Sequence, residues 1–332
     1  MKKSLLMLGT AAMMLASCTQ NEVMEVAESR TIGFDAFVGN TTKADITNSD
    51  IDKFWVFADY NNTSNWEDVF TNVQVNKPTA TGNWTPEKDA YWVSGMTYKF
   101  MGYSNGGNKF ADAEFNPATN TLKLPGYTVG NNDLIAGLTE NVTGQASDND
   151  PVSMTFSHVL SKVKFTFKTT ASADLAVKVT GITFTAVNKA DYEYSGDAMK
   201  WTENTATGAY SFGDITEIEK ADAAGKSTAY KYVIPQNNEN LQVNFTAVVG
   251  EEGNPLYGTY NLKGSLKYTE VDAGAVNNMW TPGYVYNYTA TINPELLDPD
   301  KYNKIEFTVD ANNGVEAWKP ADDTTVTPEK QE

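Results

Sequence analysis

The sequence predicts an all-β protein with two antiparallel β-sandwich domains, preceded by a signal peptide and a short leader. Many short segments alternate apolar with polar residues, and combinations of Gly, Asn and Pro separate them. No segment has both the length and the amphipathic period of a helix, and no unit of roughly 20–50 residues repeats. The 332 residues, of which 41% are hydrophobic and 12% aromatic, suffice for the cores of about two domains.

The beginning of the chain has the features of an export signal. A basic start is followed by an apolar stretch at 5–15, which is too short to span a bilayer as a permanent helix. Leu-Ala-Ser-Cys at 15–18 resembles the lipobox of bacterial lipoproteins, whose cysteine is acylated and becomes the new N-terminus. We therefore expect a lipoprotein signal peptide at 1–17 and acyl chains on Cys18 that hold the protein at a membrane surface. The alternative is an unmodified cysteine within a discarded signal peptide.

Residues 18–30 are expected to form a short acylated leader. They include three glutamates and no aromatic residue, and they end at the only arginine of the chain, since 24 of the 25 Lys and Arg residues are lysines. Arg30 lies directly before the first segment with strand alternation, which starts at Thr31. Either Arg30 is the chance survivor of an arginine-poor composition, or it marks a site that a protease recognises.

Alternation and aromatic content locate the strands in order along the chain. At 31–38 the residues Ile, Phe, Ala and Val occupy every second position. The segments 53–60 and 96–104 are rich in aromatic and β-branched residues, which favours strands. Three later segments alternate most clearly and predict half-buried antiparallel strands at 159–168, 240–249 and 284–292.

The segment 159–168 has the cleanest two-faced pattern. Its apolar face is predicted to consist of Val159, Val163, Phe165 and Phe167. The lysines and the threonine between them are predicted to face water, because successive side chains of a strand point to opposite faces.

The polar segment 144–151, which ends in proline, is the best candidate for a domain boundary. It gives an N-terminal β-sandwich domain at 31–150 and a C-terminal β-sandwich domain at 151–318. The last residues, 319–332, are polar and contain two prolines, so we expect a flexible tail.

Residue counts argue against several kinds of function. His158 is the only histidine and Cys18 the only cysteine, which excludes an intramolecular disulfide and any metal site with several His or Cys ligands. His158 begins a strand of packing residues, so we expect a structural histidine and neither an enzyme nor a cofactor. The net charge of −17, together with the lack of a lysine run, argues against nucleic acid as a partner.

Two kinds of binding site remain possible: a metal site built from oxygen ligands, and a ligand site built on exposed aromatic rings. The acidic stretches 147–151 and 298–306 have carboxylates at alternate positions, but neither has the central Gly and terminal Glu of a calcium-binding loop. We expect solvated acidic loops and no metal, and the binding of Ca²⁺ stays open. Trp66 and Trp84 lie in polar stretches that are predicted to be loops, so they are the best candidates among the seven tryptophans for contact with a ligand such as a sugar.

Several stretches, taken in order, resemble the fimbrillin family of Bacteroidales, whose members are lipoprotein-derived type V pilins. The lipobox at Cys18 is the first, and TIGFDAFVGNTTKADIT (31–47) followed by IDKFWVFADY (51–60) is the second. The set is completed by NNDLIAG (131–137), FSHVLSKVKFTF (156–167) and WTPGYVYNYTATI (280–292). These matches keep the order and spacing of the family over most of the chain.

The resemblance implies transthyretin-like β-sandwich domains and a defined maturation. In this family, precursors reach the outer membrane and the cell surface as lipoproteins, and a protease that prefers Arg cuts before the first retained strand. A terminal strand of the neighbouring subunit then fills the groove that the removed strand leaves. Carried onto this sequence, Cys18 is the acylated (palmitoylated) residue, and the cleaved bond lies between Arg30 and Thr31. Lys43 is the main competing cleavage site.

The C-terminal end leaves the rank of the subunit open. Asn313-Gly314 is a hairpin signal, so the segment 304–318 is expected to fold back on its own domain rather than to leave as a donor strand. Beyond Trp318 only Val326 offers an apolar anchor, which makes the tail a poor donor. A stalk, a tip and an anchor subunit are all compatible with the sequence.

The function we expect is that of a cell-surface fimbrial (pilus) subunit. It would begin as an outer-membrane lipoprotein precursor, be matured by a protease, and polymerise head to tail with other subunits by donor-strand exchange. Its biological output would be adhesion to a host or bacterial surface. The alternative is a lipid-anchored surface lipoprotein that binds glycans through Trp66 and Trp84 and does not polymerise. An acid-pair hydrolase is the third and weakest alternative.

Overall fold

The protein is all-β, as the sequence predicts. The computed structural model describes residues 31–38, 51–78, 84–145, 150–171, 175–195, 198–220, 222–250, 253, 257–268, 270–272, 275–301, 303–309 and 315–317. In this part of the chain the secondary structure consists of 22 β-strands and one 3₁₀ turn, η1 (Pro294–Leu296). No helix within the described residues is long and apolar enough to cross a membrane.

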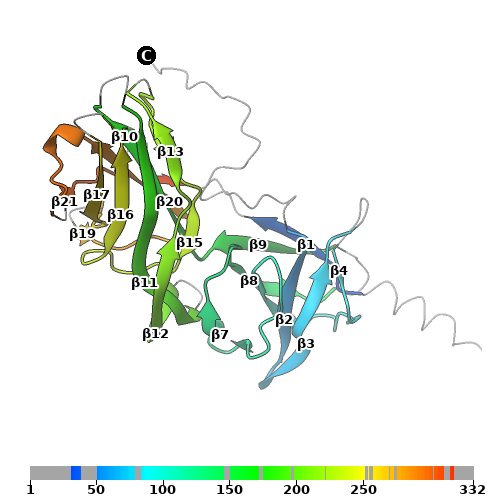
Figure 1. The fold of residues 1–332 in the computed structure, drawn as a ribbon. Helices are drawn as coiled ribbons and strands as arrows, with labels where there is room; N and C mark the ends of the chain where they lie inside the picture. The colour runs from blue at the N-terminus through cyan, green and yellow to red at the C-terminus, as the bar shows by residue number, and fades with distance from the viewer. Residues whose placement is uncertain are drawn as a thin grey trace, which may run out of the picture.

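The N-terminal group of strands is one seven-stranded sheet whose two ends meet (Figure 1). Its strand order is β1 (Phe34–Val38), β9 (Val152–His158), β8 (Ile135–Thr143), β5 (Thr97–Ser104), β2 (Lys53–Asn62), β3 (Asn65–Asn76) and β4 (Thr85–Pro86). Trp84, directly before β4, exchanges two backbone hydrogen bonds with Phe34 of β1, with N···O distances of 3.1 and 2.8 Å. The sheet is therefore curled around its own core.

Strand β2 is an inner strand of this sheet, between β5 and β3, and is buried on both faces. Residues 54–59 are all buried, which explains why this part of the sequence is a nearly continuous apolar run. Phe54 and Val56 pack in the core that the seven-stranded sheet encloses. Trp55 and Phe57 point the other way, into a second core that is shared with the C-terminal strands.

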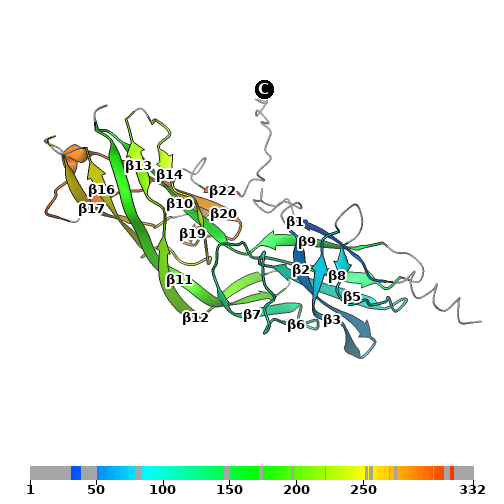
Figure 2. The same ribbon diagram turned by 45° about the vertical axis from the view of Figure 1, so that its right-hand side comes forward.

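The C-terminal group of strands is a sandwich of two sheets, one of five strands and one of eight (Figure 2). One sheet has the order β14 (Lys226–Ser227), β10 (Ser161–Thr169), β20 (Tyr284–Ile292) and β22 (Val315–Ala317), with β15 (Lys231–Val233) also paired to β10. The other has the order β21 (Asn303–Ile305), β17 (Gly258–Ser265), β16 (Gln242–Val249), β11 (Val177–Ser195), β7 (Thr121–Thr128) and β6 (Glu114–Asn116), with β12 (Ala198–Ser211) and β13 (Ile215–Ile218) also paired to β11. A separate ribbon consists of β18 (Glu270–Asp272) and β19 (Ala275–Asn277).

Aromatic residues from both sheets fill the core of this sandwich. The rings of Phe165 and Phe307 contact each other with centroids 5.7 Å apart. The ring N–H of Trp280 donates to the hydroxyl of Tyr288 at 2.9 Å, and that hydroxyl donates to the backbone oxygen of Leu266 at 2.6 Å. Burial of each such side chain stabilises the fold by about 1.5–3 kcal/mol, and the hydrogen bonds remove the cost of burying the polar atoms.

The 19-residue strand β11 joins the two groups of strands (Figures 1 and 2). Its first residues pair with β16, and its last residues pair with β7. Strand β9 follows the predicted boundary at 144–151 and yet lies in the N-terminal sheet, whereas β6 and β7 precede that boundary and lie in the same sheet as β11. Strand pairing thus crosses the boundary in both directions, and the division into 31–150 and 151–318 stays a prediction.

The alternation predicted for 240–249 and 284–292 is confirmed. Leu241 and Tyr284, at the start of each segment, are half-buried. The buried residues of β16 and β20 are Val243, Phe245, Ala247, Val249, Tyr286, Tyr288, Ala290 and Ile292. These strands have one face on the core and one face toward solvent, so their own residues determine which face is buried.

The pattern predicted for 159–168 is confirmed on its apolar face only. The four predicted core residues are buried, but Lys162 and Thr166 on the opposite face are buried as well. Two tyrosine rings cover Lys162, whose Nζ lies 3.9 Å from the ring centroid of Tyr230 and 5.0 Å from that of Tyr232. Burial lowers the pKa of Lys162 to about 7. The face predicted to be wet is therefore covered by a segment far along the chain.

Candidate assembly site at the N-terminal edge strand

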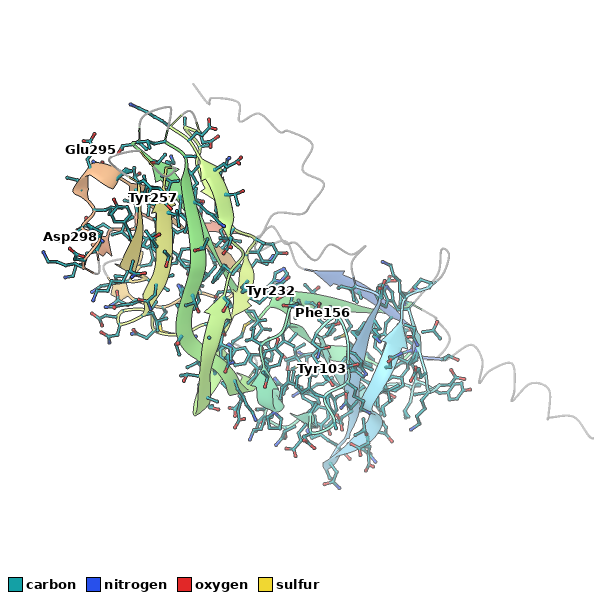
Figure 3. The ribbon with its side chains drawn as sticks, in the orientation of Figure 1. Tyr103, Phe156, Tyr232, Tyr257, Glu295 and Asp298 are labelled. Carbon is teal, nitrogen blue, oxygen red and sulfur yellow. The ribbon has the colours of Figure 1, made fainter. Side chains whose placement is uncertain are left out.

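Strand β1 lies at one edge of the N-terminal sheet and pairs in parallel with β9. The register runs from Phe34 opposite Val152 to Val38 opposite Phe156, which is labelled in Figure 3. At the start of this register the N–H of Val152 donates to the oxygen of Gly33 at 2.9 Å. Parallel partners are not joined by a tight turn, so β1 depends on its own contacts to stay in place.

The inward side chains of β1, together with Ile32 just before it, complete the N-terminal core. Ile32 and Phe34 are fully buried. The ring centroid of Phe34 lies 5.8 Å from that of each of three neighbouring rings, namely Phe54, Phe70 and Phe100. Burial of one Phe or Ile side chain is worth about 1.5–3 kcal/mol. Without β1 the sheet would therefore have an apolar groove beside β9.

Backbone contacts anchor the beginning of this segment. Thr31 forms an isolated antiparallel bridge with Tyr91, and Ile32 donates its N–H to the oxygen of Ala90 at 2.9 Å. Together with the bridge between Phe34 and Trp84, these contacts tie the residues after position 30 to the far end of the same sheet.

The predicted acylation and cleavage residues flank the described part of β1. Cys18 and Arg30 precede the first described residue, and Lys43 lies between residues 38 and 51. All three therefore fall outside the described residues, and Thr31 is the member of the predicted junction that the structure places. The acylation of Cys18 and the cleavage at Arg30 stay predictions.

The C-terminal segment lies on its own group of strands. Strand β21 pairs in parallel with β17, Thr308 bridges Thr289 of β20, and β22 runs antiparallel along β20. The described residues of the segment 304–318 thus lie on the sheets of their own group of strands, as predicted. Within the described residues β22 pairs with β20. Asn313 and Gly314 fall outside those residues, so a hairpin at this turn stays a prediction. Trp318 and the tail fall outside the described residues.

The side chains of the segment 303–309 are only partly buried. Ile305, Phe307 and Val309 alternate with exposed residues and pack half-buried against the C-terminal core. The ring of Phe307 reaches furthest, with its centroid 5.7 Å from that of Phe165 and 6.2 Å from that of Phe245. This segment covers the core at its edge.

The two tryptophans predicted as ligand contacts are not loop residues. Trp66 belongs to β3 and is half-buried, and Nζ of Lys99 lies 4.7 Å from its ring centroid. Trp84 is 7% exposed, and its ring centroid lies 5.5 Å from that of Phe54 in the N-terminal core. The loop prediction is wrong for both, because the sheet pairs these polar stretches. The contact of Trp66 and Trp84 with a ligand stays a prediction. Trp84 packs in the core and therefore exposes less surface to a ligand than Trp66 does.

The only histidine of the chain forms a buried hydrogen bond with a carboxyl group. Nδ1 of His158 contacts Oδ2 of Asp133, and Oδ1 of Asp133 accepts the backbone N–H of Leu134 at 2.8 Å. The two side chains are 1% and 0% exposed. Burial raises the pKa of Asp133 to about 6, and the contact with His158 opposes this shift. The pair lies where β8 and β9 enter the core between the two groups of strands, which is a structural position.

The acidic stretch 298–306 is tied within itself. Asp298 forms an ion pair with Lys301 at 2.8 Å, and this contact is the main reason that the pKa of Asp298 is lowered. Figure 3 labels Asp298 at the end of the C-terminal group, far from Phe156. Within the described residues no three His, Cys, Asp or Glu side chains are grouped to hold a metal ion. Most of the stretch 147–151 falls outside those residues.

A buried carboxyl that the sequence did not single out lies on β2. Asp59 is 6% exposed and stands opposite Asp68 of β3 and Lys99 of β5. Burial, followed by the hydrogen bond and the charge of Asp68, raises the pKa of Asp59 to about 7. The apolar run at 54–58 is the signal in the sequence, because an acid that directly follows such a run in the same strand is itself buried.

The raised pKa of Asp59 predicts that replacing this residue stabilises the fold by an amount that depends on pH. Between about pH 4 and pH 7 the folded chain keeps a proton that the unfolded chain has released, so stability falls as the pH rises through this window, by at most about 4 kcal/mol. Asp59→Asn removes the ionisation. We expect its melting temperature to exceed that of the wild type at pH 8 and to approach it at pH 4, as measured by circular dichroism.

The matched control for this prediction is Asp112→Asn, which changes an exposed carboxyl in the same half of the chain. It is expected to leave the difference between pH 4 and pH 8 unchanged. A gain of equal size at both pH values in Asp59→Asn would contradict the assignment of the effect to ionisation.

Comparison with known proteins places this fold in a family. A fimbrillin-like family model matches residues 40–316, which is most of the chain. No curated protein sequence matches the chain. Similar crystal structures include candidate cell adhesion proteins from Bacteroides ovatus (TM-score 0.52, 16% identity, 88% of this chain and 98% of that chain covered) and from Parabacteroides distasonis (TM-score 0.50, 11% identity, 89% and 99% covered). A fimbrilin from Porphyromonas gingivalis is also similar (TM-score 0.43, 13% identity, 88% and 98% covered).

The family match and the shared fold agree with the sequence resemblance. The Bacteroides ovatus and Parabacteroides distasonis structures share the fold of this chain over nearly their whole length. The family model covers the strands on both sides of β11. The chain therefore belongs to the fimbrillin-like family of cell-surface fimbrial and adhesion subunits, which associate with other fimbrial subunits and are not enzymes.

Proposed function

We propose that this fimbrillin-like chain is exported as an outer-membrane lipoprotein acylated at Cys18, matured by proteolysis, and assembled head to tail by strand exchange, with adhesion as its output. The position of β1 is the observation that carries the proposal. This five-residue edge strand contributes buried side chains to the N-terminal core, and it lies between the two candidate cleavage sites.

The two candidate cuts would have different consequences. A cut after Arg30 removes the acylated leader and leaves β1 in place, with Thr31 in its bridge. A cut after Lys43 removes β1 as well, which vacates the positions of Ile32 and Phe34 and exposes the edge of β9. We therefore propose that cleavage at Arg30 frees the chain from its lipid anchor, and that cleavage at Lys43 opens the acceptor groove.

An opened groove of this kind favours a strand from another subunit. The edge of β9 would present unpaired backbone N–H and C=O groups, and the apolar lining would be exposed to water. An added strand satisfies both, because its backbone completes the ladder and its alternate side chains fill the groove. Only a strand with apolar residues at every second position meets this requirement.

The segment 303–309 has the pattern that the groove requires. Ile305, Phe307 and Val309 follow one another at the spacing of Ile, Phe and Ala in 32–36, the buried face that β1 provides. On their own core these three side chains are only half-buried. In the isolated chain this segment lies on its own core. Transfer into the groove of a neighbour would increase the burial of its three side chains, so we propose that it leaves its own core on assembly and acts as the donor, in preference to the polar tail beyond Trp318.

The N-terminus of the mature protein tests this proposal. Subunits recovered from assembled fimbriae are expected to begin at Ala44, because β1 has left them. Subunits that are released without assembly are expected to begin at Thr31. N-terminal sequencing of the two fractions, separated by size, measures both, and uncut precursor with an acylated Cys18 in the membrane fraction serves as the internal reference.

Assembled subunits that begin at Thr31 would contradict the removal of β1. If every fraction contained only chains that begin at acylated Cys18, cleavage itself would be refuted and the lipid-anchored, monomeric lipoprotein would be the better account.

A further inference from the structure

A cavity of about 490 Å³ opens between the β11–β12 hairpin, β15 and the loop after β7. Its size falls in the range of about 300–1,000 Å³ that is typical of small-ligand sites. The lining that matters here consists of three aromatic rings, two amides and one cation, namely Tyr210, Tyr230, Tyr232, Asn131, Asn188 and Lys231. Figure 3 labels Tyr232, which lies between the two groups of strands.

A β-bulge places Asn188 at this cavity. The register between β11 and β12 shifts by one residue between Val187 and Lys189, so Asn188 is the extra residue. Bulges of this kind redirect a side chain and are frequent beside functional sites. At Gly208 of the facing strand a β-carbon would collide with the amide of Asn188. The glycine therefore leaves the space that the amide occupies.

Side chains take over the hydrogen bonds that the bulge disrupts. The amide of Gln236 accepts the N–H of Val187 at 2.9 Å and donates to its oxygen at 3.1 Å. The hydroxyl of Tyr210 donates to the same oxygen at 2.8 Å. The backbone oxygen of Asn188 accepts the backbone N–H of Val129 at 2.9 Å, which ties the loop after β7 to the bulge. The wall of the cavity is thus fixed before any ligand arrives.

The aromatic side of the cavity is fixed as well. Tyr230 is 42% exposed, and its ring meets that of Tyr232 edge-on, with centroids 5.6 Å apart at 82°. Nζ of Lys162 lies 3.9 Å from the ring centroid of Tyr230, so the buried lysine packs against this ring from within the fold. A large aromatic side chain that is half exposed in a concave site offers an apolar face to a ligand while its hydroxyl stays wet.

We propose that this cavity binds a saccharide unit of a glycan. The apolar C–H face of a pyranose ring would pack on Tyr230, and its hydroxyls would exchange hydrogen bonds with Asn131 and Asn188, whose amides both donate and accept. Among the residues that line the cavity Lys231 alone is charged, which disfavours phosphorylated ligands that need several cations. A purely apolar ligand would leave the amides without partners.

The test uses the full-length, uncleaved protein and a fixed set of sugars: the methyl glycosides of glucose, galactose, mannose, N-acetylglucosamine and fucose, and sialic acid. Saturation-transfer difference NMR detects millimolar binding of each. At least one sugar is expected to bind the wild type. Tyr230→Ala is expected to weaken this binding at least tenfold, and Asn188→Ala about tenfold, as the loss of one hydrogen bond implies.

The control variant is Tyr257→Ala. Tyr257 is exposed to a similar degree, at 48%, and Figure 3 places it at the end of the C-terminal group away from Tyr232. It is expected to bind like the wild type. The proposal is overturned if none of the sugars binds, or if the bound sugar binds Tyr230→Ala and Tyr257→Ala equally, with both variants folded by circular dichroism. Because the measurement needs no cleavage, its failure leaves the assembly proposal intact.

Discussion

Replacing His158 with leucine is expected to lower the free energy of unfolding by about 3–5 kcal/mol, because it leaves the buried carboxyl of Asp133 without its partner. Both side chains are at most 1% exposed, so water cannot replace the lost contact. With His158 present, burial already raises the pKa of Asp133 to about 6, and this environment strongly disfavours a lone charge. Leucine fills most of the volume of the imidazole ring, so an empty cavity contributes little to the loss.

Urea unfolding, followed by the fluorescence of the seven tryptophans, measures this change. The control is Glu239→Ala, which breaks an exposed ion pair with Lys267 and is expected to cost less than about 1 kcal/mol. A double variant, Asp133→Leu with His158→Leu, is expected to be more stable than His158→Leu, since it contains no unpaired carboxyl. Equal losses in His158→Leu and Glu239→Ala would contradict a structural role for the pair.

The strands with one wet face could be predicted from the sequence. In β16 and β20 every second residue is apolar, and the fold buries those residues because the other face of each strand meets solvent. In β2 an aromatic and apolar run indicated a strand, but alternation could not show that both faces are covered. The all-β class followed from such local patterns, which depend only on neighbouring residues.

Contacts between distant segments account for what the sequence did not predict. Lys162 is buried because Tyr230 and Tyr232 cover it, and both come from the segment at the start of β15, much later in the chain. Trp84 looked like a loop residue because its neighbours are polar, yet it pairs with Phe34 and closes the N-terminal sheet. No period in the sequence around either residue contains this information.

The candidate assembly site was partly predictable for the same reason. The lone arginine and the alternation after Thr31 can be read directly from the sequence. The parallel pairing of β1 with β9 cannot, because it joins segments that are far apart. That pairing changes the meaning of the two cleavage sites, since only a cut after β1 would open a groove.

Moving the only arginine from position 30 to position 43 is expected to turn a chain that stays monomeric after cleavage into one that polymerises. The wild type offers an Arg-specific protease a single site, before β1. The variant Arg30→Lys with Lys43→Arg offers the same protease a single site after β1. The two chains have the same composition and net charge, so a difference between them reports on the removal of β1 and its buried Phe34.

A further substitution tests the proposed donor segment independently of the acceptor groove. Phe307→Ser in the relocated-arginine variant removes the largest side chain of the proposed donor segment, which is only half-buried in the isolated chain. This chain is expected to be cut and to remain monomeric. Because Phe307 also packs against the C-terminal core, circular dichroism before cleavage checks that this variant is folded.

The most direct test of the account is the size distribution of the two chains after complete cleavage by the same Arg-specific protease, measured by size-exclusion chromatography with light scattering. The account predicts one monomeric peak for the wild type and a ladder of oligomers for Arg30→Lys with Lys43→Arg. A ladder from the wild type, or a fully cleaved relocated-arginine chain that stays monomeric, would contradict the claim that removal of β1 opens the acceptor groove.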